Sequence, residues 1–116
     1  MAIQRIEPGP RMSAAVVHGD TVYLAGHVAD AAKGKSVGEQ TKDILAQIEE
    51  TLAASGSDKS KILSTTIYLA DIKTFGEMNA VWDKWVAQGH TPARATVEAK
   101  LAAPQFTVEI VMIAAR

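Results

Sequence analysis

Two segments with helical apolar spacing, separated by a β-branched run, constrain the fold of this chain more than any other feature. Apolar residues recur every three or four positions over residues 37–54, with Ser36 placed to act as N-cap. A second stripe follows Asp71, a further N-cap candidate. It consists of Phe75, Met78, Trp82, Trp85 and Val86. Residues 62–69 between the helices are typical of a buried strand. Because such amphipathic helices are unstable alone, each must cover the face of a sheet.

Short strand-like runs flank this helical pair on both sides. Residues 13–17 and 21–25 are separated by a turn at Gly19, whereas residues 7–12, with two prolines, read as a loop. Strands are also expected from Arg94 and over residues 106–114. The order ββ-α-β-α-ββ predicts one α+β domain over residues 1–116 with both helices on one face. The other face is left uncovered, which indicates an oligomer.

Polar and small apolar residues alternate strictly along the segment that begins at Arg94. The alternation places Arg94, Thr96, Glu98 and Lys100 on one face of a strand, so that one face can pack while the other stays polar. The guanidinium of Arg94 is a planar fork that suits a carboxylate. Most arginines are exposed, however, and residue type alone favours a solvated strand charge.

Glu109 is a second candidate, because it interrupts the apolar run of the last strand. A carboxylate between Val108 and Ile110 requires a partner or water. It is either an edge residue facing solvent, which is slightly favoured, or a pocket acid suited to proton transfer. A simple hairpin about Pro104 would set Glu98 opposite Glu109, an unfavourable pairing, and the sequence leaves this register open.

Composition and charge exclude several classes of function. The 116 residues include no cysteine, which excludes thiol chemistry. The net charge of −1 carries no single-sign field for nucleic acid or anionic lipid, so a small ligand is favoured. No stretch is long and apolar enough for a membrane span, and no apolar leader is present at the amino terminus, so we expect a cytoplasmic protein.

The three histidines do not have the spacing of a metal site, and we expect no metal. His18 and His90 lie in expected loops. His27 follows Gly26 at the end of a strand and is a candidate for lining a pocket, and Gly26 permits a close approach by a ligand.

The residues Pro92-Ala93-Arg94, Val97-Glu98, Leu101, Pro104 and Val108-Glu109-Ile110 to Ile113-Ala114 resemble the carboxy-terminal signature of the Rid family, also called RidA/YjgF. Residues 19–26 resemble the first hairpin of that family, and residues 75–85, with Asn79, resemble its second helix. Residues 69–92 are most similar to the short YoaB-like bacterial branch. Because the resemblance extends over nearly the whole chain, it outweighs the solvent-exposed alternative for Arg94.

The resemblance implies a chorismate mutase-like α+β fold with a mixed sheet. It also implies a homotrimer whose sheets form a central barrel, with three ligand clefts between subunits. The implied activity is hydrolysis of reactive 2-imino acids and enamines, such as 2-aminoacrylate, to 2-keto acids and ammonia without a cofactor. Arg94 would bind the substrate carboxylate, and Glu109 would position or activate the attacking water.

The substrate-binding wall carried over from the family comprises Met12, Ala25, Gly26 and His27, and departs from the usual pattern. Met12 replaces a tyrosine, Ala25 a common serine, and His27 a common glutamine. Val111 stands where a second glutamate is frequent. Two alternatives remain: a non-catalytic trimer that binds small carboxylate metabolites, and an endoribonuclease, which the near-neutral charge disfavours.

Overall fold

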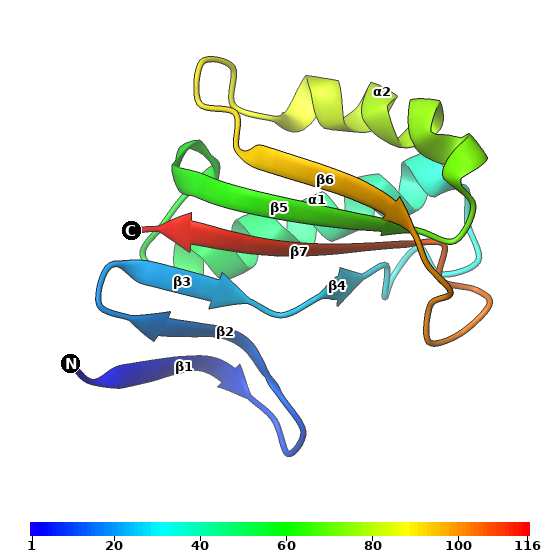
Figure 1. The fold of residues 1–116 in the computed structure, drawn as a ribbon. Helices are drawn as coiled ribbons and strands as arrows, with labels where there is room; N and C mark the ends of the chain where they lie inside the picture. The colour runs from blue at the N-terminus through cyan, green and yellow to red at the C-terminus, as the bar shows by residue number, and fades with distance from the viewer.

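The computed structural model describes residues 1–116 and contains two helices on one face of a seven-stranded sheet (Figure 1). The strand order is β1-β2-β3-β7-β5-β6, and β4 also pairs with β7. The pairing of β5 with β6 is parallel and all other pairings are antiparallel, so the sheet is mixed, as expected. The strands are β1 (Ile3–Pro8), β2 (Ser13–His18), β3 (Thr21–Leu24), β4 (His27–Val28), β5 (Ile62–Leu69), β6 (Ala93–Glu98) and β7 (Val108–Ala115).

Helix α1 (Val37–Ala54) runs behind the sheet and has the predicted bounds. Ser36 Oγ accepts from Glu39 N at 3.2 Å, and Glu39 Oε2 accepts from Ser36 N at 3.4 Å, which forms a capping box. After Ser55, Gly56 adopts a φ of +78° and ends the helix. The buried apolar stripe of α1 packs onto the central strands and supplies much of the core.

Helix α2 (Phe75–Trp85) lies beside β6 and α1. Asp71 caps a short 3₁₀ turn, Ile72–Thr74, and not α2 itself, because that turn occupies the residues between Asp71 and the helix. Met78 and Trp82 are buried as the stripe predicts, whereas Phe75 stays 41% exposed. Neither helix is long and apolar enough to cross a membrane.

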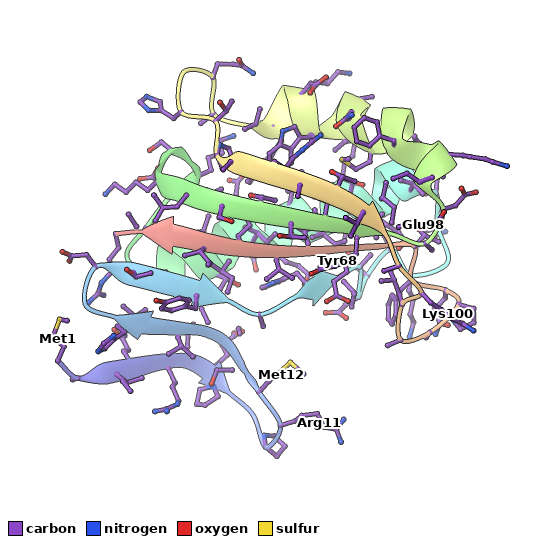
Figure 2. All side chains as sticks on the ribbon, in the orientation of Figure 1. Met1, Arg11, Met12, Tyr68, Glu98 and Lys100 are labelled. Carbon is purple, nitrogen blue, oxygen red and sulfur yellow. The ribbon has the colours of Figure 1, made fainter.

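The element order expected from the sequence omits β1 and β4. Strand β1 pairs with β2 from Ile3 opposite His18 to Pro8 opposite Ser13, so the expected loop at residues 7–12 shrinks to Gly9–Met12. Proline is tolerated at the end of an edge strand, where its missing N–H disturbs no ladder. Five of the six residues of β1 are exposed, which removes the burial alternation that identifies a strand from sequence. Figure 2 shows Arg11 and Met12 in the loop after β1.

Strands β6 and β7 do not form the hairpin considered from the sequence, because β5 lies between them. Glu109 pairs with Tyr68 on β5 and with Val28 on β4. Glu98 instead accepts a hydrogen bond from the backbone N–H of Ile72 at 3.0 Å, just beyond the carboxyl end of β5. The like-charge pairing therefore does not arise.

On β6 the polar face is packed and the apolar face is exposed, which is the reverse of the usual arrangement for an amphipathic strand. Its polar residues Arg94 and Thr96 are half-buried beneath α2, whereas Ala93, Ala95 and Val97 are exposed on the face that no helix covers. The uncovered sheet face expected from the sequence is thus present. Tyr23 and Val97 leave 48% and 43% of their surfaces exposed on it.

Candidate functional site

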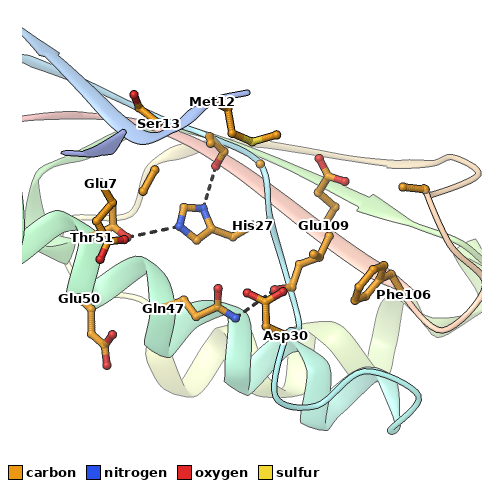
Figure 3. Close-up of a pocket in the computed structure, with 15 residues that line it drawn as sticks. Glu7, Met12, Ser13, His27, Asp30, Gln47, Glu50, Thr51, Phe106 and Glu109 are labelled. Atoms are coloured by element: carbon orange, nitrogen blue, oxygen red, sulfur yellow. Dashed lines mark hydrogen bonds between the residues drawn. The ribbon is translucent and has the colours of Figure 1, made fainter. Parts of the chain in front are cut away.

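A cavity of about 610 Å³ opens where the sheet is interrupted between β3 and β4 (Figure 3). Both strands pair with β7, whereas Ala25 and Gly26 between them do not pair with it. The cavity is completed by the loop after β1, by one face of α1 and by the loop before β7. We call it the β4 cavity. Five residues selected from the sequence line it: Met12, Ala25, Gly26, His27 and Glu109.

Glu109 reaches the β4 cavity because of its position on β7. Its neighbours Val108 and Ile110 are fully buried in the core, so alternation turns the Glu109 side chain to the opposite side of the sheet. There the carboxylate lies across the backbone of Gly26. A Cβ on Gly26 would stand 3.1 Å from Glu109 Cδ and would overlap Oε2. Glycine at this position therefore allows the carboxylate to approach the backbone.

His27 turns toward α1, away from the Glu109 carboxylate (Figure 3). Its Nδ1 lies 2.8 Å from the carbonyl oxygen of Ala25, which can only accept, so Nδ1 carries the hydrogen. Nε2 lies 3.3 Å from Thr51 Oγ1. In the neutral ring, Nε2 accepts from that hydroxyl, and the two contacts fix the orientation of the ring.

Arg94 is held between two aromatic rings on the helix-covered face of the sheet. Its Nη1 donates to Asn79 Oδ1 at 2.8 Å. The guanidinium carbon lies 5.2 Å from the Trp82 ring centre and 5.7 Å from that of Phe75, within cation–π range. The one ion pair within 4.0 Å in the structure joins Lys59 to Glu49, so no acid of the chain neutralises Arg94.

Within one chain, Arg94 and Glu109 do not meet. Arg94 shares its face with Thr65 and Met112, which are buried beneath the helices, whereas Glu109 points to the other face. Strand β5 also separates β6 from β7, and Arg94 does not line the β4 cavity. The sequence therefore selected two residues that a single subunit holds apart.

Several lining residues were not selected from the sequence. Among them are Glu7, Asp30, Gln47, Glu50, Thr51 and Phe106. Gln47, Glu50 and Thr51 recur at helical spacing and share one face of α1, which is the signal that could have found them. Glu7 and Asp30 lie outside any periodic segment of the sequence, so only the folded chain brings them to the cavity.

A mixed sheet backed by two helices, with a cavity at a break in the sheet, places this chain in the α+β class. The model of the family described as endoribonuclease L-PSP matches residues 2–116. The chain belongs to this family, which is the one identified from the sequence as Rid, or RidA/YjgF.

Individual relatives agree with this assignment. A RutC family protein of Haemophilus influenzae is 47% identical over 114 residues, with 98% of each chain covered. RutC family protein YoaB of Escherichia coli K12 is 45% identical, with 99% of each covered. A 2-iminobutanoate/2-iminopropanoate deaminase of Rattus norvegicus is 35% identical over 88% of this chain and 77% of that protein. The crystal structure of NMB1025, a YjgF family member from Neisseria meningitidis, has a TM-score of 0.96 at 46% identity, over 100% of this chain and 96% of that one.

Proposed function

We propose that this protein hydrolyses reactive 2-imino acids and enamines to 2-keto acids and ammonia, without a cofactor. The observation that carries the proposal is the state of Arg94. Its guanidinium is half-buried, oriented by Asn79 and two aromatic rings, and has no acidic partner in the chain. A ligand carboxylate supplies the missing negative charge and matches the planar fork of donors.

The protein acts as a homotrimer in this proposal. Arg94 lies on β6 at one edge of the sheet, and β1 forms the other edge. A head-to-tail ring joins one edge of each subunit to the opposite edge of the next, and closes when the rotation suits a small number of copies. The Arg94 of one subunit then completes the β4 cavity of its neighbour, and the uncovered sheet faces line a central barrel.

The chemistry requires orientation more than activation, because the imine carbon is already electrophilic. Arg94 binds the carboxylate, and Glu109 accepts a proton from water as the water oxygen bonds to the imine carbon. Starting from the protonated imine, this addition gives a tetrahedral product with a hydroxyl and an amino group on that carbon. Glu109 returns its proton to the nitrogen, and the C–N bond breaks as the hydroxyl loses its proton and becomes the carbonyl, which releases ammonia and leaves the 2-keto acid. An enamine first tautomerises to the imine.

The test generates imino acids in situ with an amino-acid oxidase or threonine dehydratase and follows keto-acid release above the spontaneous rate. Glu109→Gln keeps the shape but loses the base, so turnover is expected to fall by about 10²-fold while 2-keto acid binding survives. Arg94→Ala is expected to weaken that binding by roughly ten-fold to a hundred-fold. Wild-type turnover in either folded variant contradicts the proposal.

The second candidate is a non-catalytic trimer that binds small carboxylate metabolites through Arg94. It is favoured by Met12, which lines the β4 cavity with 61% of its surface exposed and offers no proton donor in place of the family's tyrosine. Binding of 2-keto acids by a wild-type protein that accelerates no imine hydrolysis would establish it. An endoribonuclease is disfavoured because the cavity is lined by carboxylates, which repel a phosphate backbone.

A further inference from the structure

A second cavity lies in the helix layer, away from the β4 cavity. Its volume is about 380 Å³, and it is lined by one face of α1, one face of α2 and Lys59 in the turn before β5. We call it the helix groove. On α1 it uses none of the residues that face the β4 cavity, so this helix separates the two cavities. Both helices lie on one side of the sheet (Figure 1), opposite the uncovered face, and the groove therefore stays accessible in the proposed ring.

The two helices are joined by hydrogen bonds on either side of the helix groove. Gly38 N donates to Glu77 Oε2 at 2.8 Å, near the start of each helix. Farther along, Trp85 Nε1 donates to Glu49 Oε1, and the Lys59 ammonium donates to the Trp85 carbonyl oxygen at 2.8 Å. The same ammonium lies 5.3 Å from the centre of the Trp85 ring. Because these contacts fix the helices relative to each other, the groove between them is preformed.

The surface of the helix groove between these contacts is apolar. Ala46 on α1 and Ala80 on α2 line it, and their short side chains leave space above Leu45 and Val81. At about 30 Å³ per water molecule, a volume of about 380 Å³ has room for roughly a dozen waters. That is the bulk of an organic molecule with about ten non-hydrogen atoms. The groove therefore suits the apolar body of a small molecule.

Two lysines without an acidic partner flank this apolar surface. Lys42 on α1 and Lys84 on α2 line the groove, and the residue four positions away on the groove face of each helix is an alanine. An acid at that spacing would pair with the lysine. The one ion pair within 4.0 Å joins Lys59 to Glu49, which is the only acid lining the groove. Lys42 and Lys84 thus leave two uncompensated positive charges, which attract an anion and repel a cation.

We infer that the helix groove binds a small amphiphilic anion, with an apolar body of about ten non-hydrogen atoms and one carboxylate or other acidic group. The body packs on Leu45, Val81 and the side chain of Trp85. The acidic group lies between the ammonium groups of Lys42 and Lys84. The ligand binds without a covalent step, and the site does not depend on the proposed function of the β4 cavity.

The test measures the binding of octanoate by titration calorimetry, with 1-octanol and octyltrimethylammonium as neutral and cationic probes of the same chain length. Octanoate is expected to bind at least about five-fold more tightly than 1-octanol, and octyltrimethylammonium more weakly than either. The double variant Lys42→Gln/Lys84→Gln is expected to remove the preference for octanoate over 1-octanol. Ala80→Leu introduces a good helix former at an exposed position, and is expected to fill the groove and weaken the binding of both by at least about ten-fold.

Lys33→Gln/Lys73→Gln is the matched control, because it removes the same charge from two exposed lysines outside the groove. It is expected to keep the wild-type affinity for octanoate. Excess 2-ketobutyrate is expected to leave octanoate binding unchanged, since the proposed function assigns that carboxylate to Arg94. The inference is overturned if octanoate does not bind, binds no better than 1-octanol, keeps its affinity in Ala80→Leu, or is displaced by 2-ketobutyrate. Imine hydrolysis is measured separately, so failure of this inference and failure of the proposed function are distinguished.

Discussion

Replacing Gly26 with alanine is expected to remove most of the turnover while leaving the fold intact. The φ of Gly26 lies outside the left-handed region, so alanine is compatible with the backbone. The new Cβ would stand 3.1 Å from Glu109 Cδ and overlap Oε2, which is the end of a flexible side chain. The carboxylate must therefore move by on the order of 1 Å, and a displacement of that size at a reacting group costs about 10²-fold in rate.

The stability of Gly26→Ala should change little. Alanine reduces the entropy of the unfolded chain by an amount worth about 0.4–1 kcal/mol, which offsets the cost of moving one half-buried carboxylate. We expect the melting temperature to stay within about 5 °C of wild type. The assay is keto-acid release from imines generated in situ, measured beside thermal unfolding and the binding of 2-ketobutyrate, whose carboxylate the proposed function assigns to Arg94.

Gly76→Ala is the matched control, because nothing lies within 4 Å of its added Cβ. Gly76 sits in α2, so alanine there should raise the free energy of unfolding by up to about 1 kcal/mol with turnover unchanged. If Gly26→Ala has wild-type turnover, the observed position of the Glu109 carboxylate is not required for catalysis, and the reasoning is refuted. Loss of folding in that variant would refute the claim that the side chain can move at low cost.

Three further outcomes are expected. Light scattering should give three times the 12.3 kDa chain mass, and a monomer at micromolar concentration would remove the intersubunit cleft. Mixing refolded Arg94→Ala and Glu109→Gln subunits in equal amounts should restore about a quarter of the wild-type sites, because every mixed ring contains one intact cleft; no recovery in mixed trimers contradicts a cleft shared between subunits. Arg94→Lys should raise KM roughly ten-fold, since an ammonium lacks the planar fork, and an unchanged KM argues against bidentate binding.

Local sequence patterns were sufficient to predict the elements in which buried residues recur at regular spacing. Helix α1, with its Ser36 cap, and strand β5 have the predicted bounds, because each packs one regular stripe or face against the core. Strand β1 was missed for the opposite reason: it lies at the sheet edge with most residues exposed, so burial imposes no pattern on it. The two-residue strand β4 is too short to carry a pattern.

The sequence indicated individual residues of the candidate site but not how they are arranged in space. Arg94 and Glu109 were selected because each is a charged residue in an otherwise regular strand. Gly26 and His27 were selected because they follow a strand end, and the resemblance to the Rid family then added Met12 and Ala25. Neither argument revealed the acids Glu7, Asp30 and Glu50, since cavity-lining residues from distant segments share no local signal.

The sequence by itself determined where the helices and most strands form, because helical and strand periodicity are properties of neighbouring residues. It also determined that one sheet face would remain uncovered. Only the tertiary structure decided that β5 separates β6 from β7, that the polar face of β6 packs under α2, and that Arg94 and Glu109 lie on opposite faces. The order of the strands, and the face that each strand turns to the core, depend on contacts between residues far apart in the chain. A local alternation of residues does not indicate which of its two faces is buried.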